Sequence, residues 1–124
     1  MVVELDFAGD ICTVRIKGRF ATGRDADYLR QKTDEIKNSG CRRVLADFKD
    51  VPYIDSTGIG FLIGVYTSIV RIENGRFAMA NVNPHIQEVL RVTRLLNIFS
   101  VYPDETSARE ALQGEAKAAA QREP

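Results

Sequence analysis

The sequence is poor in the residues on which metal sites and disulfide frameworks depend. Its 124 residues include two cysteines, one histidine and no tryptophan. Cys12 and Cys41 form no Cys-x-x-Cys pair, and His85 has no histidine partner. A structural zinc site or a disulfide framework normally needs closely spaced groups of such residues. We therefore expect two free thiols, no bound metal and no cofactor.

The chain also has no excess of either charge. Lysine plus arginine number 17, aspartate plus glutamate number 17, and the formal net charge at pH 7 is +0. A nucleic-acid-binding domain of this size usually carries a basic excess that neutralises phosphates. We therefore do not expect direct binding to nucleic acid.

Long hydrophobic runs are absent as well. No apolar stretch approaches the roughly 20 residues that a membrane-spanning helix needs. Glu4 and Asp6 stand near the start of the sequence, where a secretory signal would have basic residues. We expect no membrane span and a cytoplasmic location, where reduced thiols are typical.

What the sequence does contain is an ordinary globular balance, with 44% hydrophobic and 27% charged residues. Alternating apolar and polar residues predict a hairpin of two strands, at 3–7 and 12–16. Short apolar runs predict further strands at 44–48, 77–80 and 98–102. Helical spacing and cap residues predict helices over 25–39, over 56–73, from 83 onwards and from 103 to about 112.

This order of elements predicts an α/β fold. Strands and helices alternate after the hairpin, which is typical of a mixed β-sheet of about five strands flanked by about four α-helices. The length suits a single domain, which we place at residues 1–112. Residues 113–124 form a polar, alanine-rich C-terminal tail, and we expect this tail to fray.

The most informative segment is VPYIDSTGIG, residues 51–60. Asp55, Ser56 and Thr57 are all good N-cap residues, and three in succession exceed what one helix requires. A phosphate on Ser56, with a charge near −2, would lie at a helix N-terminus, where unpaired amides and the helix dipole favour an anion. From the residues alone, Ser56 is either a helix cap or a phosphoacceptor.

Glycines are unexpectedly frequent in the helix that follows. Gly58, Gly60 and Gly64 each cost about 1 kcal/mol relative to alanine in a helix interior. Such a cost indicates that a second backbone comes close on that face, or that side chains there would obstruct a partner.

The apolar residues of this helix are too numerous for one face. A stripe at helical spacing is expected to face the sheet, and it comprises Ile59, Leu62, Ile63, Tyr66, Ile69 and Val70. Phe61 and Val65 lie off that stripe. They either form an exposed apolar strip for docking or are covered by a neighbouring helix, and the sequence leaves both alternatives open.

Catalytic motifs do not fit this segment. A nucleophile elbow needs glycine two residues before Ser56, where the chain has Ile54, and a dinucleotide fingerprint needs glycine at the position of Ile63. No Gly-Lys-Ser or Gly-Lys-Thr phosphate loop occurs, and His85 stands at a predicted helix start, where solvent exposure is the commoner role. We do not expect an enzyme.

Residues 47–60, DFKDVPYIDSTGIG, resemble the signature of STAS domains, especially the bacterial anti-sigma factor antagonists. The resemblance extends over about residues 3–112. It implies that Ser56 is phosphorylated by an anti-sigma factor that is itself an ATP-dependent serine kinase. It also implies that the unphosphorylated protein binds this kinase and so releases a sigma factor, and that a PP2C-type phosphatase resets the switch. Transcription would then be regulated indirectly.

On this interpretation the partner-binding residues are Asp55, Ser56, Thr57, Gly58, Gly60 and Phe61. One position departs from the family pattern, since Ala21 stands where the family usually has an aspartate near the phosphorylation loop. Ala21 favours an alternative, in which the chain is a structural STAS subunit of a transport or sensory assembly and is never phosphorylated. The intact Asp55-Ser56-Thr57-Gly58 run favours the antagonist.

Overall fold

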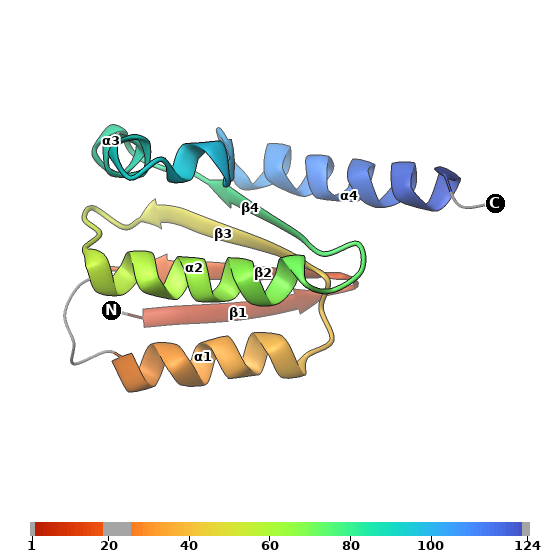
Figure 1. Ribbon diagram of the computed structural model, residues 1–124, viewed down its shortest axis with the longest axis horizontal. Helices are drawn as coiled ribbons and strands as arrows, with labels where there is room; N and C mark the ends of the chain where they lie inside the picture. The colour runs from red at the N-terminus through yellow and green to blue at the C-terminus, as the bar shows by residue number, and fades with distance from the viewer. Residues whose placement is uncertain (1, 19–25, 123–124) are drawn as a thin grey trace.

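The computed structural model describes residues 2–18 and 26–122 and contains one mixed sheet (Figure 1). The N-terminal hairpin consists of β1 (Val2–Ala8) and β2 (Ile11–Lys17). The order continues with α1 (Ala26–Asn38), β3 (Arg43–Asp50), α2 (Ser56–Val70), β4 (Arg76–Ala80) and α3 (Pro84–Val92). A short 3-10 helix η2 (Leu95–Asn97), β5 (Ser100–Tyr102) and α4 (Glu105–Arg122) complete it. The predicted fold class is confirmed.

The strands lie in the order β1-β2-β3-β4-β5, which is also their order in the chain. The β1–β2 pair is antiparallel, and β2, β3, β4 and β5 are parallel to one another. The helices that connect the parallel strands therefore return the chain to the same end each time. As a result the carboxyl ends of β3 and β4 lie side by side, next to the loops that lead into α2 and α3.

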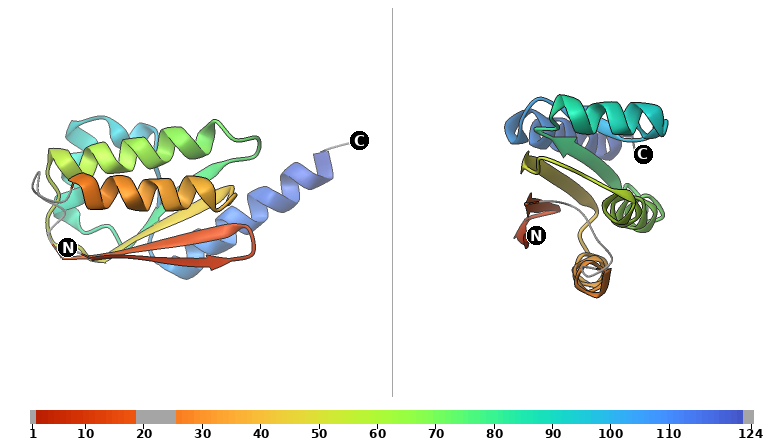
Figure 2. Two further views of the ribbon diagram at one scale, coloured as in Figure 1. Left: turned by 90° about the horizontal axis from the view of Figure 1, so that it is seen from below. Right: turned by 90° about the vertical axis from the view of Figure 1, so that its left-hand side faces the viewer.

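The two faces of the sheet carry separate apolar clusters, and Figure 2 shows α1 and α2 on one side of the sheet and α4 on the other. Helices α1, α2 and α3 pack over the larger cluster, which includes Val14, Phe48 and Met79 from the strands. Helix α4 covers the smaller cluster on the opposite face, through Ala108 and Leu112. Alternation along the strands places neighbouring residues on opposite faces, and this explains why β3 is buried on both sides.

Several element boundaries differ from those predicted. Helix α2 ends at Val70 rather than at 73, because the Ile72 amide donates to the Ile69 carbonyl oxygen, three residues back, at 3.1 Å and so leaves the α-helical pattern. Asn74 then adopts a left-handed backbone with φ of 64°. Gly75 follows so closely that a Cβ atom there would lie 1.8 Å from the Ile69 carbonyl oxygen. The last strand begins at Ser100 rather than at 98, because the Ile98 amide still donates to Leu95 O in the preceding turn.

Helix α4 also extends further than predicted. Its backbone remains helical to Arg122, ten residues past the expected end at Leu112, and the alanine-rich composition of this part favours a helix. Figure 1 shows its C-terminal part projecting beyond the ends of the strands. Fraying of residues 113–124 stays a prediction.

Candidate functional site

The N-terminus of α2 is capped by Asp55. This residue has an extended backbone, and its Oδ1 accepts hydrogen bonds from the amides of Thr57 at 2.9 Å and Gly58 at 3.2 Å. Its carbonyl oxygen accepts the first helical bond, from Ile59 N at 3.0 Å. Asp55 therefore satisfies the amides of the first turn, as an N-cap residue does.

Ser56 is the first helical residue and is exposed to solvent. Since Asp55 makes the cap, the alternative in which Ser56 serves as the cap is not what the structure shows. Helix α2 begins at the end of the molecule where β3 and β4 also end (Figure 1). The exposed position of Ser56 allows access by another protein.

The cap also corrects one expectation about a phosphate at this position. The amides of Thr57 and Gly58 are not free to receive an anion, because the Asp55 carboxylate already accepts from both. A phosphate on Ser56 would instead stand beside an existing negative charge. It would remain in solvent, favoured by the helix dipole and opposed by Asp55.

Helix α2 is rotated relative to the sequence-based expectation. Phe61 and Val65 are buried, with 7% and 2% of their surfaces exposed, whereas Ile63 and Val70 are 41% and 42% exposed. The prediction that Ile63 and Val70 face the sheet was wrong. Of the two alternatives for Phe61 and Val65, the structure shows burial, because α1 packs beside α2 and adds a second buried flank.

The outer face of α2 is consequently uncharged and partly apolar. Helical spacing places Ser56, Gly60, Ile63 and Val70 on this side, and all four are exposed. We call these four residues the α2 outer face. The sequence of the whole helix, STGIGFLIGVYTSIV, has no acidic or basic residue. A solvent-facing helix without any charge is unusual for a surface that contacts only water.

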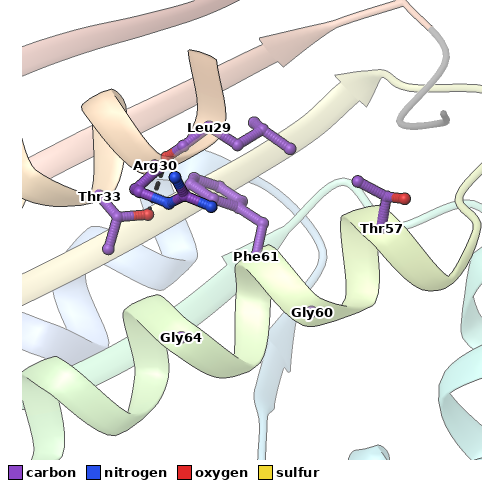
Figure 3. A pocket seen from close by; sticks show the side chains of 7 residues that line it. All are labelled: Leu29, Arg30, Thr33, Thr57, Gly60, Phe61 and Gly64. Atoms are coloured by element: carbon purple, nitrogen blue, oxygen red, sulfur yellow. Dashed lines mark hydrogen bonds between the residues drawn. The ribbon is translucent and has the colours of Figure 1, made fainter. Parts of the chain in front are cut away.

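A hollow of about 200 Å³ lies between α1 and α2, beside this face (Figure 3). Phe61 points from α2 towards α1 (Figure 3), and the lining comprises Leu29, Arg30, Thr33, Thr57, Gly60, Phe61 and Gly64. A Cβ atom at Gly60 or Gly64 would meet nothing within 4 Å. Among the described residues, therefore, no second backbone of this chain explains these glycines.

The loop that leads to Ser56 is held by the turn between β4 and α3. Asn83 Nδ2 donates to the Val51 carbonyl oxygen at 3.0 Å, and the Tyr53 and His85 rings stack with centroids 5.9 Å apart. From the sequence, Asn83 is predicted only to start a helix. These contacts join residues about 30 positions apart. They could be predicted from the sequence only by recognising that β3 and β4 are parallel neighbours, whose carboxyl ends lie side by side.

An ionic cluster lies on the side of the sheet that α4 covers, and it involves residues of β2, β3 and α4. Arg15 donates to both carboxylate oxygens of Glu105, from Nε at 2.9 Å and from Nη2 at 3.0 Å. This contact lowers the pKa of Glu105 to about 2. Asp47 is 7% exposed and accepts from Lys49 N and Asn81 Nδ2, both at 2.9 Å, and Glu105 is its acidic neighbour. Burial, and next the neighbouring Glu105, raise the pKa of Asp47.

The chain also matches the sequence model of a known protein family. The family model of the STAS domain matches residues 2–108. The chain belongs to the STAS domain family. The resemblance proposed for residues 47–60 is thereby confirmed at the level of the family.

Relatives of this STAS domain include the anti-sigma F factor antagonist of Paenibacillus polymyxa. It is 26% identical over 112 residues, which cover 90% of this chain and 94% of the relative. An anti-sigma factor antagonist from Mycobacterium paratuberculosis has a crystal structure with a TM-score of 0.80 at 18% identity, covering 90% of this chain and 93% of that one. The phosphorylated form of the Bacillus cell fate determinant SpoIIAA gives a TM-score of 0.69 at 17% identity and covers 89% and 99%. These two structures establish a shared fold.

Three further expectations from the sequence concern Ala21, metal binding and a membrane span. Ala21 lies outside the described residues. Within residues 2–18 and 26–122, the structure has no group of three or more His, Cys, Asp or Glu side chains arranged to hold a metal ion. The helices of the same segments include none long and apolar enough to cross a bilayer.

Proposed function

We propose that this STAS domain is an anti-sigma factor antagonist controlled by phosphorylation of Ser56. In its unphosphorylated form it binds an anti-sigma factor that is a serine kinase. This binding makes the anti-sigma factor release its sigma factor. Phosphorylation ends this binding, and a PP2C-type phosphatase restores it. The protein acts as a regulatory partner and not as an enzyme.

The α2 outer face is the observation that carries this proposal. It begins at an exposed hydroxyl and continues through Gly60 to Ile63 and Val70 without any charge. Partly exposed isoleucine and valine side chains gain free energy when a partner removes them from water, at roughly 25 cal/mol per Å² of apolar surface. Such a face is suited to docking, and its first residue is suited to modification.

Phosphorylation would convert this face from attractive to repulsive. A phosphate near −2 on Ser56 would add to the charge of Asp55, and burying such a charge without a partner costs several kcal/mol. At about 1.5 Å rise per residue, Ile63 stands roughly 10 Å along the helix from Ser56. This is close to the Debye length at physiological ionic strength, about 8 Å, so the added charge acts on the nearer part of the interface. The fold itself accepts the phosphate, because Ser56 is exposed.

The remaining partner-binding residues have distinct roles in this proposal. Gly60 lets a partner approach α2 closely, and Thr57 lines the adjacent hollow. Phe61 shapes the wall of that hollow from a buried position. Asp55 and buried Gly58 form the cap that orients Ser56, so their contribution to binding is indirect.

The direct test is phosphorylation by the cognate anti-sigma serine kinase with ATP, followed by mass spectrometry. We expect one phosphate on the wild-type protein and none on Ser56→Ala, while Thr57→Ala, the neighbouring-hydroxyl control, remains a substrate. Titration calorimetry with the kinase should show binding by unphosphorylated protein and at least tenfold weaker binding after phosphorylation, equivalent to about 1.4 kcal/mol. Equal incorporation into Ser56→Ala would refute the site. A wild-type protein that binds the kinase but takes no phosphate would favour the structural-subunit alternative.

A further inference from the structure

The five-residue acceptor loop, residues 51–55, determines where the Ser56 hydroxyl stands. Val51 and Ile54 are buried at 1% and 3% exposure, which fixes two points of the loop in the core. The Val51 amide donates to Phe48 O at 3.0 Å, so the start of the loop turns directly out of β3. The Val51 carbonyl, however, points away from its own strand and needs a donor from elsewhere.

That donor is the side-chain amide of Asn83, and the same amide has a second task. Its Nδ2 donates to Val51 O at 3.0 Å, while its Oδ1 accepts from the Ile86 amide at 2.8 Å and caps α3. One planar group therefore joins the acceptor loop to the first turn of a helix. Helix α3 is itself fixed, because Ile86 and Leu90 are completely buried in the core.

A ring contact adds a second attachment between the same two segments. Tyr53 is 43% exposed, yet its ring stacks on His85 with an interplanar angle of 18°. Gln87 Nε2 donates to Val82 O at 3.0 Å and so stabilises the turn from which Asn83 projects. The loop is thus held at Val51 and Tyr53 by one helix turn, before Asp55 takes over as the cap of α2.

We infer that Asn83 is a positioning residue for phosphotransfer, holding the acceptor loop so that Ser56 is presented in one orientation. The inference rests on the proposed function. A phosphoacceptor must be held close to its attack geometry, and displacements of about 1 Å reduce transfer rates strongly. On this inference Asn83 acts on Ser56 indirectly, through the Val51 carbonyl and the loop.

The chemistry of the side chain gives a selective variant. Asn83→Asp keeps the oxygen that caps α3, since aspartate and asparagine are comparable N-caps. It removes the donor to Val51 O and places a carboxylate against a carbonyl oxygen. We expect a modest loss of thermal stability and hydrogen exchange about fivefold to tenfold faster in the peptide covering residues 50–58, as for loss of one hydrogen bond. Phosphorylation should lose about tenfold in kcat with little change in KM, because the α2 outer face is intact.

Asp104→Ala is the matched control. Asp104 caps α4 through the amide of Ser107 at 2.8 Å, and no hydrogen bond found among the described residues joins it to the acceptor loop. This variant loses a helix cap of the same kind, so it should leave exchange in residues 50–58 and kcat unchanged. Unaltered exchange and phosphorylation in Asn83→Asp would overturn the inference, and so would an effect on KM alone, which would place Asn83 in the docking surface. If the wild-type protein takes no phosphate, the proposed function and the positioning role both fail, and faster exchange would then show loop anchoring only.

Discussion

At the scale of single residues, the exposed hydroxyl of Ser56 contrasts with two inaccessible thiols. Cys12 and Cys41 are both buried and free. Burial, assisted by the neighbouring Cys41 and Asp6, raises the pKa of Cys12 to about 12. Burial also raises the pKa of Cys41, whose Sγ lies 2.9 Å from Asp10 O. Because the thiolate is the nucleophile, neither native cysteine should react readily.

We therefore expect Ser56→Cys to create the reactive thiol of the protein. Alkylation by iodoacetamide at pH 7 should be more than about a hundredfold faster in Ser56→Cys than in the wild type, followed by mass spectrometry. Adding Asp55→Asn keeps the cap oxygen but removes the adjacent charge, which raises the thiolate fraction. Labelling of the double variant should be about threefold to tenfold faster than that of Ser56→Cys. Labelling as slow as in the wild type would show that position 56 is closed to reagents.

At the scale of elements, the glycines of α2 separate stability from binding. We expect Gly60→Ala and Gly64→Ala each to raise the free energy of unfolding by up to about 1 kcal/mol, because the added methyl meets open space and alanine favours the helix. Gly60→Ala should nevertheless weaken binding to the kinase, since the methyl would keep the partner's backbone away. Thermal unfolding and calorimetry measure the two effects on the same samples.

Gly75→Ala is the contrasting control for this prediction. Its methyl would lie 1.8 Å from the Ile69 carbonyl oxygen, and relieving that overlap should cost about 1–3 kcal/mol of stability. If Gly60→Ala binds the kinase as tightly as the wild type, the hollow between α1 and α2 is not part of the interface.

Helix α2 also shows how far sequence reasoning reaches. Its start was predicted, because Asp55 followed by Ser56 is a strong local cap signal. Its buried side was not, because STGIGFLIGVYTSIV is apolar almost all round and its spacing favours no single face. The choice depends on α1, which packs beside α2 from a distant part of the chain. The link from Asn83 to Val51 was missed for the same reason, since the residues meet only once β3 and β4 are parallel neighbours.

At the scale of the whole molecule, one ionic cluster joins three elements, β2, β3 and α4. Glu105 in the first turn of α4 binds Arg15 of β2 and neighbours the carboxyl group of Asp47 of β3. The two carboxyl groups favour opposite states. Arg15 keeps Glu105 ionised, whereas burial and the nearby Glu105 favour a proton on Asp47. The free energy of the folded protein is lowest when Asp47 and Glu105 together carry a single negative charge.

Asp47→Asn mimics the protonated carboxyl and should stabilise the protein near neutral pH. The raised pKa means that folded wild-type protein holds a proton on Asp47 at pH values where the unfolded chain has lost it, so wild-type stability falls as pH rises through that window. The asparagine oxygen can still accept from Lys49 and Asn81, and its amide can donate to Glu105. We expect a Tm gain of about 2–5 °C at pH 7, which shrinks as pH falls below 4. Glu105→Gln should behave oppositely, losing stability at pH 7 and converging with the wild type as pH falls from 4.5 towards about 2. Parallel Tm–pH curves for Asp47→Asn and the wild type would show that folding does not shift the pKa of Asp47.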